Sequence, residues 1–134
     1  MELHVENKVY LVAGASKGLG YAIAEQLALN GASVAIASRS ESAIKASARA
    51  LSEATGADVR GYTMDASSGV SIADWVAQAS ADFGRVDGLV VNAGGPPPGQ
   101  FDVFSDEDWQ AAFELTLMSA VRCHIYARRV GDRF

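Results

Sequence analysis

The stretch VAGASKGLGYAIAEQLA, residues 12–28, joins a short apolar run to a helix-like run through a glycine-rich turn. Its glycines, Gly14, Gly18 and Gly20, follow the spacing G-x-x-x-G-x-G. Because glycine has no Cβ atom, such a turn can be tight, and its backbone N–H groups can approach a pyrophosphate. The helix that starts here would direct its N-terminal amides at the same anion. The stretch therefore predicts a strand, a phosphate-binding turn and a helix; a turn without a ligand is the alternative.

Outside this stretch, apolar runs that indicate buried strands alternate with helical patterns. Ser40 and Ser105 are expected to cap helices, and glycines at positions 31, 56 and 131 to end them. The predicted strands are residues 8–13, 34–37, 59–64 and 86–91, and the predicted helices, with their caps, are residues 19–30, 40–55, 71–83 and 105–131. On the last helix, the side chains expected to face inward are Trp109, Phe113, Leu117, Ala120 and Val121.

Strands that alternate with helices predict βαβ units and a parallel sheet. Right-handed crossovers give the four strands the order 3-2-1-4. The predicted fold class is therefore α/β, a Rossmann-type three-layer αβα arrangement. A length of 134 residues favours a single domain, residues 1–134. The strand order reverses between the first and fourth strands, so a ligand crevice is expected at their carboxyl ends.

The composition limits the partners of the chain. Its formal net charge of −5 argues against binding along a nucleic-acid backbone. No apolar run is long enough to span a bilayer, and residues 2–7 are too polar for a secretory signal. The one cysteine, Cys123, rules out an internal disulfide and is expected to be a buried thiol. We therefore expect a cytoplasmic protein with no nucleic-acid, membrane or metal partner. The late arginines are interpreted as a solvated helix end: Arg122, Arg128, Arg129 and Arg133.

The end of the second predicted strand bears on which dinucleotide the turn would hold. An acidic residue near this point would bind the ribose 2′-hydroxyl of NAD, but residues 37–40 read Ala-Ser-Arg-Ser. Arg39 offers a guanidinium suited to a 2′-phosphate, and Lys17 in the turn adds a second cation. These residues favour NADP (NADPH) over NAD, with two ordinary surface charges as the alternative.

Two further strand ends supply candidate contacts. Asp65 closes the third predicted strand and would either accept a hydrogen bond from the adenine amino group or cap the local turn. Asn92 ends the fourth strand and would line the ribose and nicotinamide side, bond backbone between neighbouring strands, or do both. The complete predicted cofactor-binding set is Gly14, Ser16, Lys17, Gly18, Leu19, Gly20, Arg39, Ser40, Asp65, Ala66, Asn92, Ala93 and Gly94.

Taken together, these motifs resemble the classical short-chain dehydrogenase/reductases over residues 5–125. AGASKGLG (residues 13–20) is similar to the family's T-G-x-x-x-G-x-G, and VNAG (residues 91–94) to its N-N-A-G. Arg39 and Ser40 look like its NADP-preferring strand end, Asp65 like its adenine-contacting residue, and residues 105–121 like its fourth helix. Within the family, the chain looks most like the 3-oxoacyl-carrier-protein reductases. The resemblance implies a bound dinucleotide and hydride transfer between a carbonyl and an alcohol.

The sequence departs from the family pattern at three motif positions. Ala13 replaces the motif threonine, and Val91 replaces the first asparagine of N-N-A-G. Thr116 stands where the family usually has an asparagine that helps to hold a proton-relay water. A relay of that kind is therefore not predicted for this chain.

The residues that complete the reaction in the family are not found in this sequence. There, a catalytic serine follows a fifth strand and a Y-x-x-x-K motif lies on a fifth helix, whereas this chain reaches only the fourth helix. Lysine occurs only at positions 8, 17 and 45, never four residues after a tyrosine. We therefore predict an NADP(H)-binding short-chain dehydrogenase/reductase domain without catalytic residues, inactive alone.

Two other functions are open at this point: a non-catalytic regulatory module that senses a nucleotide, and an interaction module that pairs with a full-length relative. Without a fifth strand, residues 89–91 would form an open sheet edge and the last helix would lack neighbours. We therefore expect a homo-oligomer joined through the fourth strand or the last helix.

Overall fold

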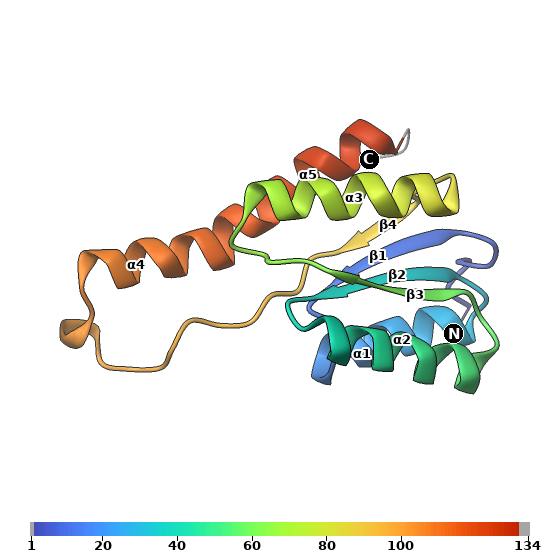
Figure 1. Cartoon of the computed structure of the whole chain (residues 1–134), viewed down its shortest axis with the longest axis horizontal. Coiled ribbons are helices and arrows are strands. Elements are labelled where there is room, and N and C mark those ends of the chain that lie inside the picture. The colour runs from blue at the N-terminus through green and yellow to red at the C-terminus, as the bar shows by residue number, and fades with distance from the viewer. Residues whose placement is uncertain (1, 132–134) are drawn as a thin grey trace.

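The computed structural model describes residues 2–131, so Arg133 of the predicted basic cluster lies outside the described residues. Strands and helices alternate along the chain up to the end of the sheet, and a long helical segment follows (Figure 1). The elements are β1 (Val9–Ala13), α1 (Gly18–Leu29), β2 (Ser33–Ser38), α2 (Glu41–Thr55), β3 (Val59–Thr63), α3 (Gly69–Phe83), β4 (Gly88–Val90), a 3-10 turn (Phe101–Val103), α4 (Asp106–Phe113), the π-helical segment η2 (Glu114–Met118) and α5 (Ser119–Val130).

The four strands form one parallel sheet in the order β3-β2-β1-β4, which confirms the predicted fold class and strand order. Val12 in the middle of the sheet lies in register with Ile36 of β2 and Val90 of β4. Figure 1 shows α1 and α2 on one face of the sheet and α3 and α5 on the other, so the arrangement has three layers.

Alternate side chains of the central strands fill the two interfaces between the layers. Val12 and Ile36 point into the cluster on the α1–α2 face, whereas Leu11 packs with Trp75 in the cluster on the α3–α5 face. All four side chains are buried. Burying a large apolar side chain contributes about 1.5–3 kcal/mol. Packing against helices on both faces therefore holds the sheet in place, and with it the edge at which the strands end.

Most predicted helix caps are present. The Ser40 hydroxyl accepts from the Ala43 amide at the start of α2, and Ser105 forms a capping box with Asp108 at the start of α4. The predicted start of α3 at residue 71 is wrong, because Ser68 caps the helix by accepting from the Ser71 amide and α3 begins at Gly69. The predicted strand 86–91 is shorter in the structure, where β4 covers Gly88–Val90.

The predicted inward face of the last helix is wrong. Trp109, Phe113, Leu117 and Val121 are exposed, while Ala120 is half-buried. In Figure 1, α4 extends beyond the sheet, and only α5 lies over α3. The residues that α5 buries are Ser119, Cys123 and Ala127, which lie two positions after Leu117, Val121 and Ile125 of the apolar pattern.

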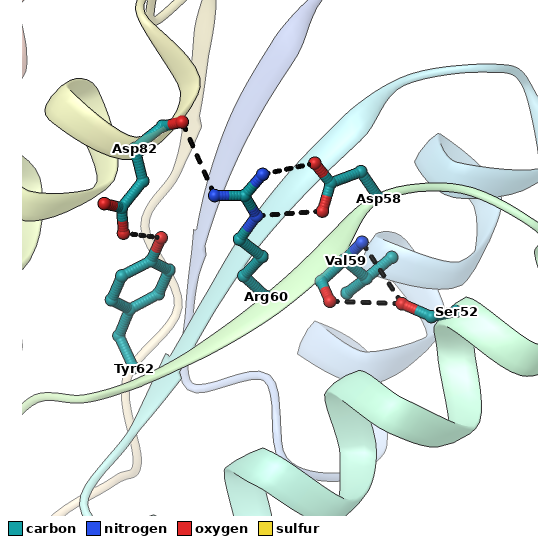
Figure 2. A network of polar contacts seen from close by, with 6 residues as sticks. All are labelled: Ser52, Asp58, Val59, Arg60, Tyr62 and Asp82. Atoms are coloured by element: carbon teal, nitrogen blue, oxygen red, sulfur yellow. Dashed lines mark hydrogen bonds and ion pairs between the residues drawn. The ribbon is translucent and has the colours of Figure 1, made fainter.

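The outer strands of the sheet, β3 and β4, differ in their surroundings. At the β3 edge, the Arg60 guanidinium donates to both carboxylate oxygens of Asp58, at 2.9 and 2.7 Å (Figure 2). Tyr62 Oη donates to Asp82 Oδ2 at 2.8 Å, and burial together with this hydrogen bond raises the pKa of Tyr62. Charged groups along an edge strand disfavour pairing with another strand. Among residues 2–131, no strand pairs with the outer edge of β4.

Candidate functional site

Three segments meet at the carboxyl edge of the sheet. The glycine turn follows β1, and the Ala15 amide donates to the carbonyl oxygen of Ala37 in β2 at 3.1 Å. Asn92, just after β4, donates from Nδ2 to the carbonyl oxygen of Gly14 at 3.0 Å. Asn92 thus makes the bond between neighbouring strands that one of its two interpretations predicted. The structure therefore joins the glycine turn to the carboxyl end of β2 and to the residues that follow β4.

The glycines of the turn serve two different purposes. Gly14 has a φ of +62°, and a Cβ atom there would lie 2.5 Å from the Asn92 carbonyl oxygen. Gly14 is therefore required by the packing of the turn itself. Gly18 also has a φ of +62°, but apart from its chain neighbours and the backbone of its own helix no described residue comes within 4 Å of the position that its Cβ would take. The left-handed φ therefore requires a glycine at position 18, and the absence of close packing leaves the backbone of the turn accessible.

Helix α1 begins at Gly18. Lys17 is the N-cap residue, and within residues 2–131 no side chain caps the helix at this end. The amides of the first turn have no partner within the helix, and they carry the positive end of the helix dipole. The arrangement therefore suits an anion beside Gly18. Leu19, the other predicted contact here, exposes its side chain to solvent.

Ser47, which was not predicted from the sequence, binds the glycine turn from α2. Ser47 lies on the buried side of α2, and its hydroxyl donates to the carbonyl oxygen of Ser16 at 2.8 Å. The sequence offered one indication of this bond. Ser47 lies between Ile44 and Leu51 on the apolar face of α2, and a buried hydroxyl needs a hydrogen-bond partner. Ser16 is therefore fixed through its backbone, next to the exposed Lys17.

Arg39 and Asp65 follow the carboxyl ends of the neighbouring parallel strands β2 and β3. The Asp65 carboxylate accepts from the Ser67 amide at 2.9 Å and from the Ser67 hydroxyl at 2.7 Å, so it caps the local turn as one interpretation predicted. These hydrogen bonds lower the pKa of Asp65, and the charge of Arg39 adds to the effect. Arg39 is exposed, and Ser40 uses its hydroxyl as the α2 cap. The adenine contact of Asp65 and the neighbouring Ala66 stays a prediction.

Beyond Asn92, the chain runs through Ala93 and Gly94 into a proline-rich loop. Between this loop and α4 lies a largely apolar cavity of about 420 Å³, whose lining includes Pro96, Phe104, Trp109 and Leu115. Thr116 lines a shallower hollow next to it. Its hydroxyl donates to the Ala112 carbonyl oxygen at 2.6 Å, so the proton of that hydroxyl is already used within the helix.

The cysteine of the chain does not lie at this edge. Cys123 is buried in the interface between α3, α5 and the sheet, as predicted, and burial raises the pKa of its thiol to about 11. Such a thiol is a poor nucleophile at neutral pH. Within residues 2–131, no cluster of three or more His, Cys, Asp or Glu side chains could hold a metal ion.

The sequence of this chain matches a family model. The model describes short chain dehydrogenases, and the match covers residues 8–128. The chain belongs to this family. As a short-chain dehydrogenase it has the NAD(P)-binding α/β architecture, and its motifs place it among the classical members similar to the 3-oxoacyl-carrier-protein reductases.

Individual relatives agree with this assignment. The 3-oxoacyl-(acyl-carrier-protein) reductase FabG of Escherichia coli K12 is 38% identical over 120 residues, which are 90% of this chain and 48% of that protein. The CLA biosynthesis dehydrogenase/reductase of Lactiplantibacillus plantarum is 35% identical over 116 residues, 87% of this chain and 40% of that protein. The chain therefore spans about half the length of the curated relatives it matches.

A solved structure extends the comparison to the fold. L-sorbose reductase from Gluconobacter frateurii, complexed with NADPH and L-sorbose, matches with a TM-score of 0.92 and 32% identity. The match covers 97% of this chain and 49% of that one. Every helix within residues 2–131 is too short or too polar to cross a membrane.

Proposed function

We propose that this chain binds NADP(H) at the carboxyl edge of its sheet, as the single dinucleotide-binding domain of a short-chain dehydrogenase/reductase. The observation that carries the proposal is the turn at Gly18. There, a glycine with a left-handed φ begins a helix that has no side-chain cap, and no residue beyond its chain neighbours and its own helix packs against it. A diphosphate beside Gly18 would accept hydrogen bonds from the first-turn amides of α1. Packing alone gives no reason for this combination.

The preference for NADP(H) rests on two exposed cations. Lys17 lies in the turn, and Arg39 follows β2, the strand that pairs with β1. A guanidinium binds a phosphate monoester through two parallel hydrogen bonds, which a free ribose hydroxyl cannot offer. The L-sorbose reductase similar to this chain was solved with NADPH, which agrees with the proposal.

The proposed parent reaction is hydride transfer between a carbonyl and an alcohol. NADPH, when bound, supplies the hydride, and the protein must orient the substrate and provide a proton. In our proposal the amides after Gly18 hold the diphosphate, Arg39 holds the 2′-phosphate, and Asn92 to Gly94 line the nicotinamide side. No tyrosine in the sequence is followed four residues later by lysine, so we propose that this chain alone is inactive.

A calorimetric titration with NADPH tests the proposal. We expect saturable binding with one site per chain and weaker binding of NADH. A carbonyl-reduction assay with NADPH then separates a catalytic chain from a module that only binds the nucleotide. A folded protein that gives no heat of binding with either dinucleotide would overturn the proposal and leave an interaction module as its function.

We also propose that the chain forms a homodimer through its last helix rather than through β4. Five side chains spaced four residues apart form an exposed apolar row, and each is between 39% and 50% exposed. The apolar row consists of Trp109, Phe113, Leu117, Val121 and Ile125. Its extent along the helical segment exceeds that of the three-residue β4 edge.

Charge along the helix supports a second copy as the occupant of this surface. The first turn of α4 carries Asp106, Glu107 and Asp108, and the last turn of α5 carries Arg128 and Arg129. Two antiparallel copies centred on Leu117 would place the acidic turn of one beside the basic turn of the other. A two-fold axis makes the contact self-complementary.

Leu117→Asp is expected to prevent this association. Each copy would lose the burial of one leucine, about 1.5 kcal/mol, so the dimer dissociation constant should rise about 100-fold. Sedimentation velocity measures the change. Leu29→Asp is the matched control, because Leu29 is an exposed leucine of α1 outside the apolar row. A wild-type chain that sediments as a monomer at high concentration would contradict the proposal.

A further inference from the structure

The last helical segment contains one interruption, η2. The Ser119 amide donates to the Glu114 carbonyl oxygen, five residues back instead of four. The Thr116 hydroxyl donates to the Ala112 carbonyl oxygen at 2.6 Å, and the buried Ser119 hydroxyl donates to the Thr116 carbonyl oxygen at 3.4 Å. Side-chain bonds to the helix backbone of this kind compete with the regular ladder. The segment thus accommodates an extra residue, as π-helical turns do.

This extra residue changes how the apolar row runs along the helix. In a regular α-helix, four residues advance about 40° beyond a full turn, so the four steps from Trp109 to Ile125 would wrap about 160° around the axis. A turn with one extra residue takes up roughly 100° of that advance. The row therefore stays on one side of the helix because η2 lies in its middle.

An ion pair spans the same interruption. Arg122 Nη1 lies 2.7 Å from Glu114 Oε2, and the two side chains are only 26% and 32% exposed. Gln110 Nε2 donates to the other carboxylate oxygen at 3.4 Å. In a regular α-helix, residues eight apart lie about 80° apart around the axis. The roughly 100° taken up by the extra residue brings the two residues within about 20° of each other around the axis, so the pair favours the π-helical state over the regular one.

Arg122 itself is held by the body of the protein. Its helix α5 packs against α3 and buries Cys123 and Ala127. Its side chain passes over Gly69 at the start of α3, where a Cβ atom would lie 3.3 Å from Arg122 Nε. The prediction that Arg122 belongs to a solvated basic helix end is therefore wrong. It reaches from the packed part of the helix to the first residue of η2.

We infer that the Arg122–Glu114 ion pair clamps η2 in its π-helical form and so keeps the apolar row on one face. The clamp is a feature of the chain by itself, whereas its effect on association rests on the homodimer proposed above. Arg122 and Glu114 act on that surface as positioning residues, since neither belongs to the apolar row.

A double-mutant cycle monitored by amide hydrogen exchange tests the clamp. Arg122→Met keeps the aliphatic stem over Gly69, and Glu114→Gln keeps the size of the side chain; each removes one charge. We expect either change to accelerate exchange at residues 114–118 by roughly two- to fivefold, and the double variant to be no faster than the single ones. Arg49→Ala, which removes an exposed arginine of α2, should leave exchange there unchanged. Additive effects, or exchange at the wild-type rate in both single variants, would overturn the clamp.

Sedimentation velocity on the same variants tests the link to association. We expect the dimer dissociation constant of both single variants to rise with the exchange rate. An unchanged dissociation constant alongside faster exchange would overturn the link and leave the clamp standing. A monomeric wild type would overturn the homodimer, while the exchange cycle would still decide whether the clamp exists.

Discussion

Replacing Gly18 by valine is expected to abolish the binding of NADPH and NADH alike. The Gly18 φ of +62° belongs to the left-handed region, which costs an L side chain about 1–2 kcal/mol. The larger effect is steric. A valine side chain would fill the space in front of the first turn of α1, where the proposed diphosphate accepts its hydrogen bonds. We expect the dissociation constants of both dinucleotides to rise at least about 100-fold in a calorimetric titration.

Gly56→Val is the control for the backbone cost of this change. Gly56 follows α2 with a φ of +73°, and apart from its chain neighbours no described residue comes within 4 Å of its missing Cβ. The valine there should strain the backbone to a similar extent but leave the affinity for NADPH within about twofold of wild type. Retained binding in Gly18→Val, or equal losses in the two variants, would mean that the turn is not the dinucleotide site.

The second large effect is expected from Arg39→Ala, and it should fall on NADPH alone. Hydrogen bonds to a charged group contribute about 1.5–3 kcal/mol, so the NADPH dissociation constant should rise roughly 10- to 150-fold. NADH carries no 2′-phosphate, and its dissociation constant should change less than about threefold. Titrations of both dinucleotides at one low salt concentration measure the difference, because salt screens exposed charges.

Arg49→Ala provides the matched control, since Arg49 is an exposed arginine on α2. It should leave the affinities for both dinucleotides unchanged. Equal losses of NADPH and NADH affinity in Arg39→Ala would refute the 2′-phosphate assignment. In that case Arg39 would act on a part of the cofactor that the two molecules share.

The order of the strands followed from local patterns in the sequence. Buried strands such as Val9–Ala13 appear as continuous apolar runs, and right-handed crossovers then leave few ways to order them. Element ends were less certain. Ser68 and Ser71 both offer a hydroxyl near the start of α3, and only the structure shows that Ser68 accepts from the Ser71 amide.

The candidate site was predictable where its residues lie next to the glycine turn and less so elsewhere. The spacing of the glycines was visible directly, whereas the bond from Ser47 to Ser16 joins residues 31 positions apart. For Asp65 the sequence left two roles open, and the structure shows the local one. The outcome depends on where a single carboxylate oxygen points, which no sequence pattern specifies.

The last helix shows a different limit. Its periodicity correctly identified an apolar face, but periodicity does not say what covers that face. Leu117 and Val121 were expected in the core and are exposed. The interruption at η2 contains the hydrogen bond from Thr116 and, as we infer above, is held by the ion pair between Glu114 and Arg122. It changes the number of residues per turn, on which the prediction of the inward face was based.

The buried thiol of Cys123 has a practical consequence for spectroscopy. It is the one cysteine of the chain, it is 1% exposed, and the raised pKa keeps it protonated at neutral pH. Thiol-directed dyes and spin labels should therefore leave the native protein unmodified. A cysteine introduced on α4 would carry the label alone, so distances between two copies of the molecule could be measured without first removing the natural residue.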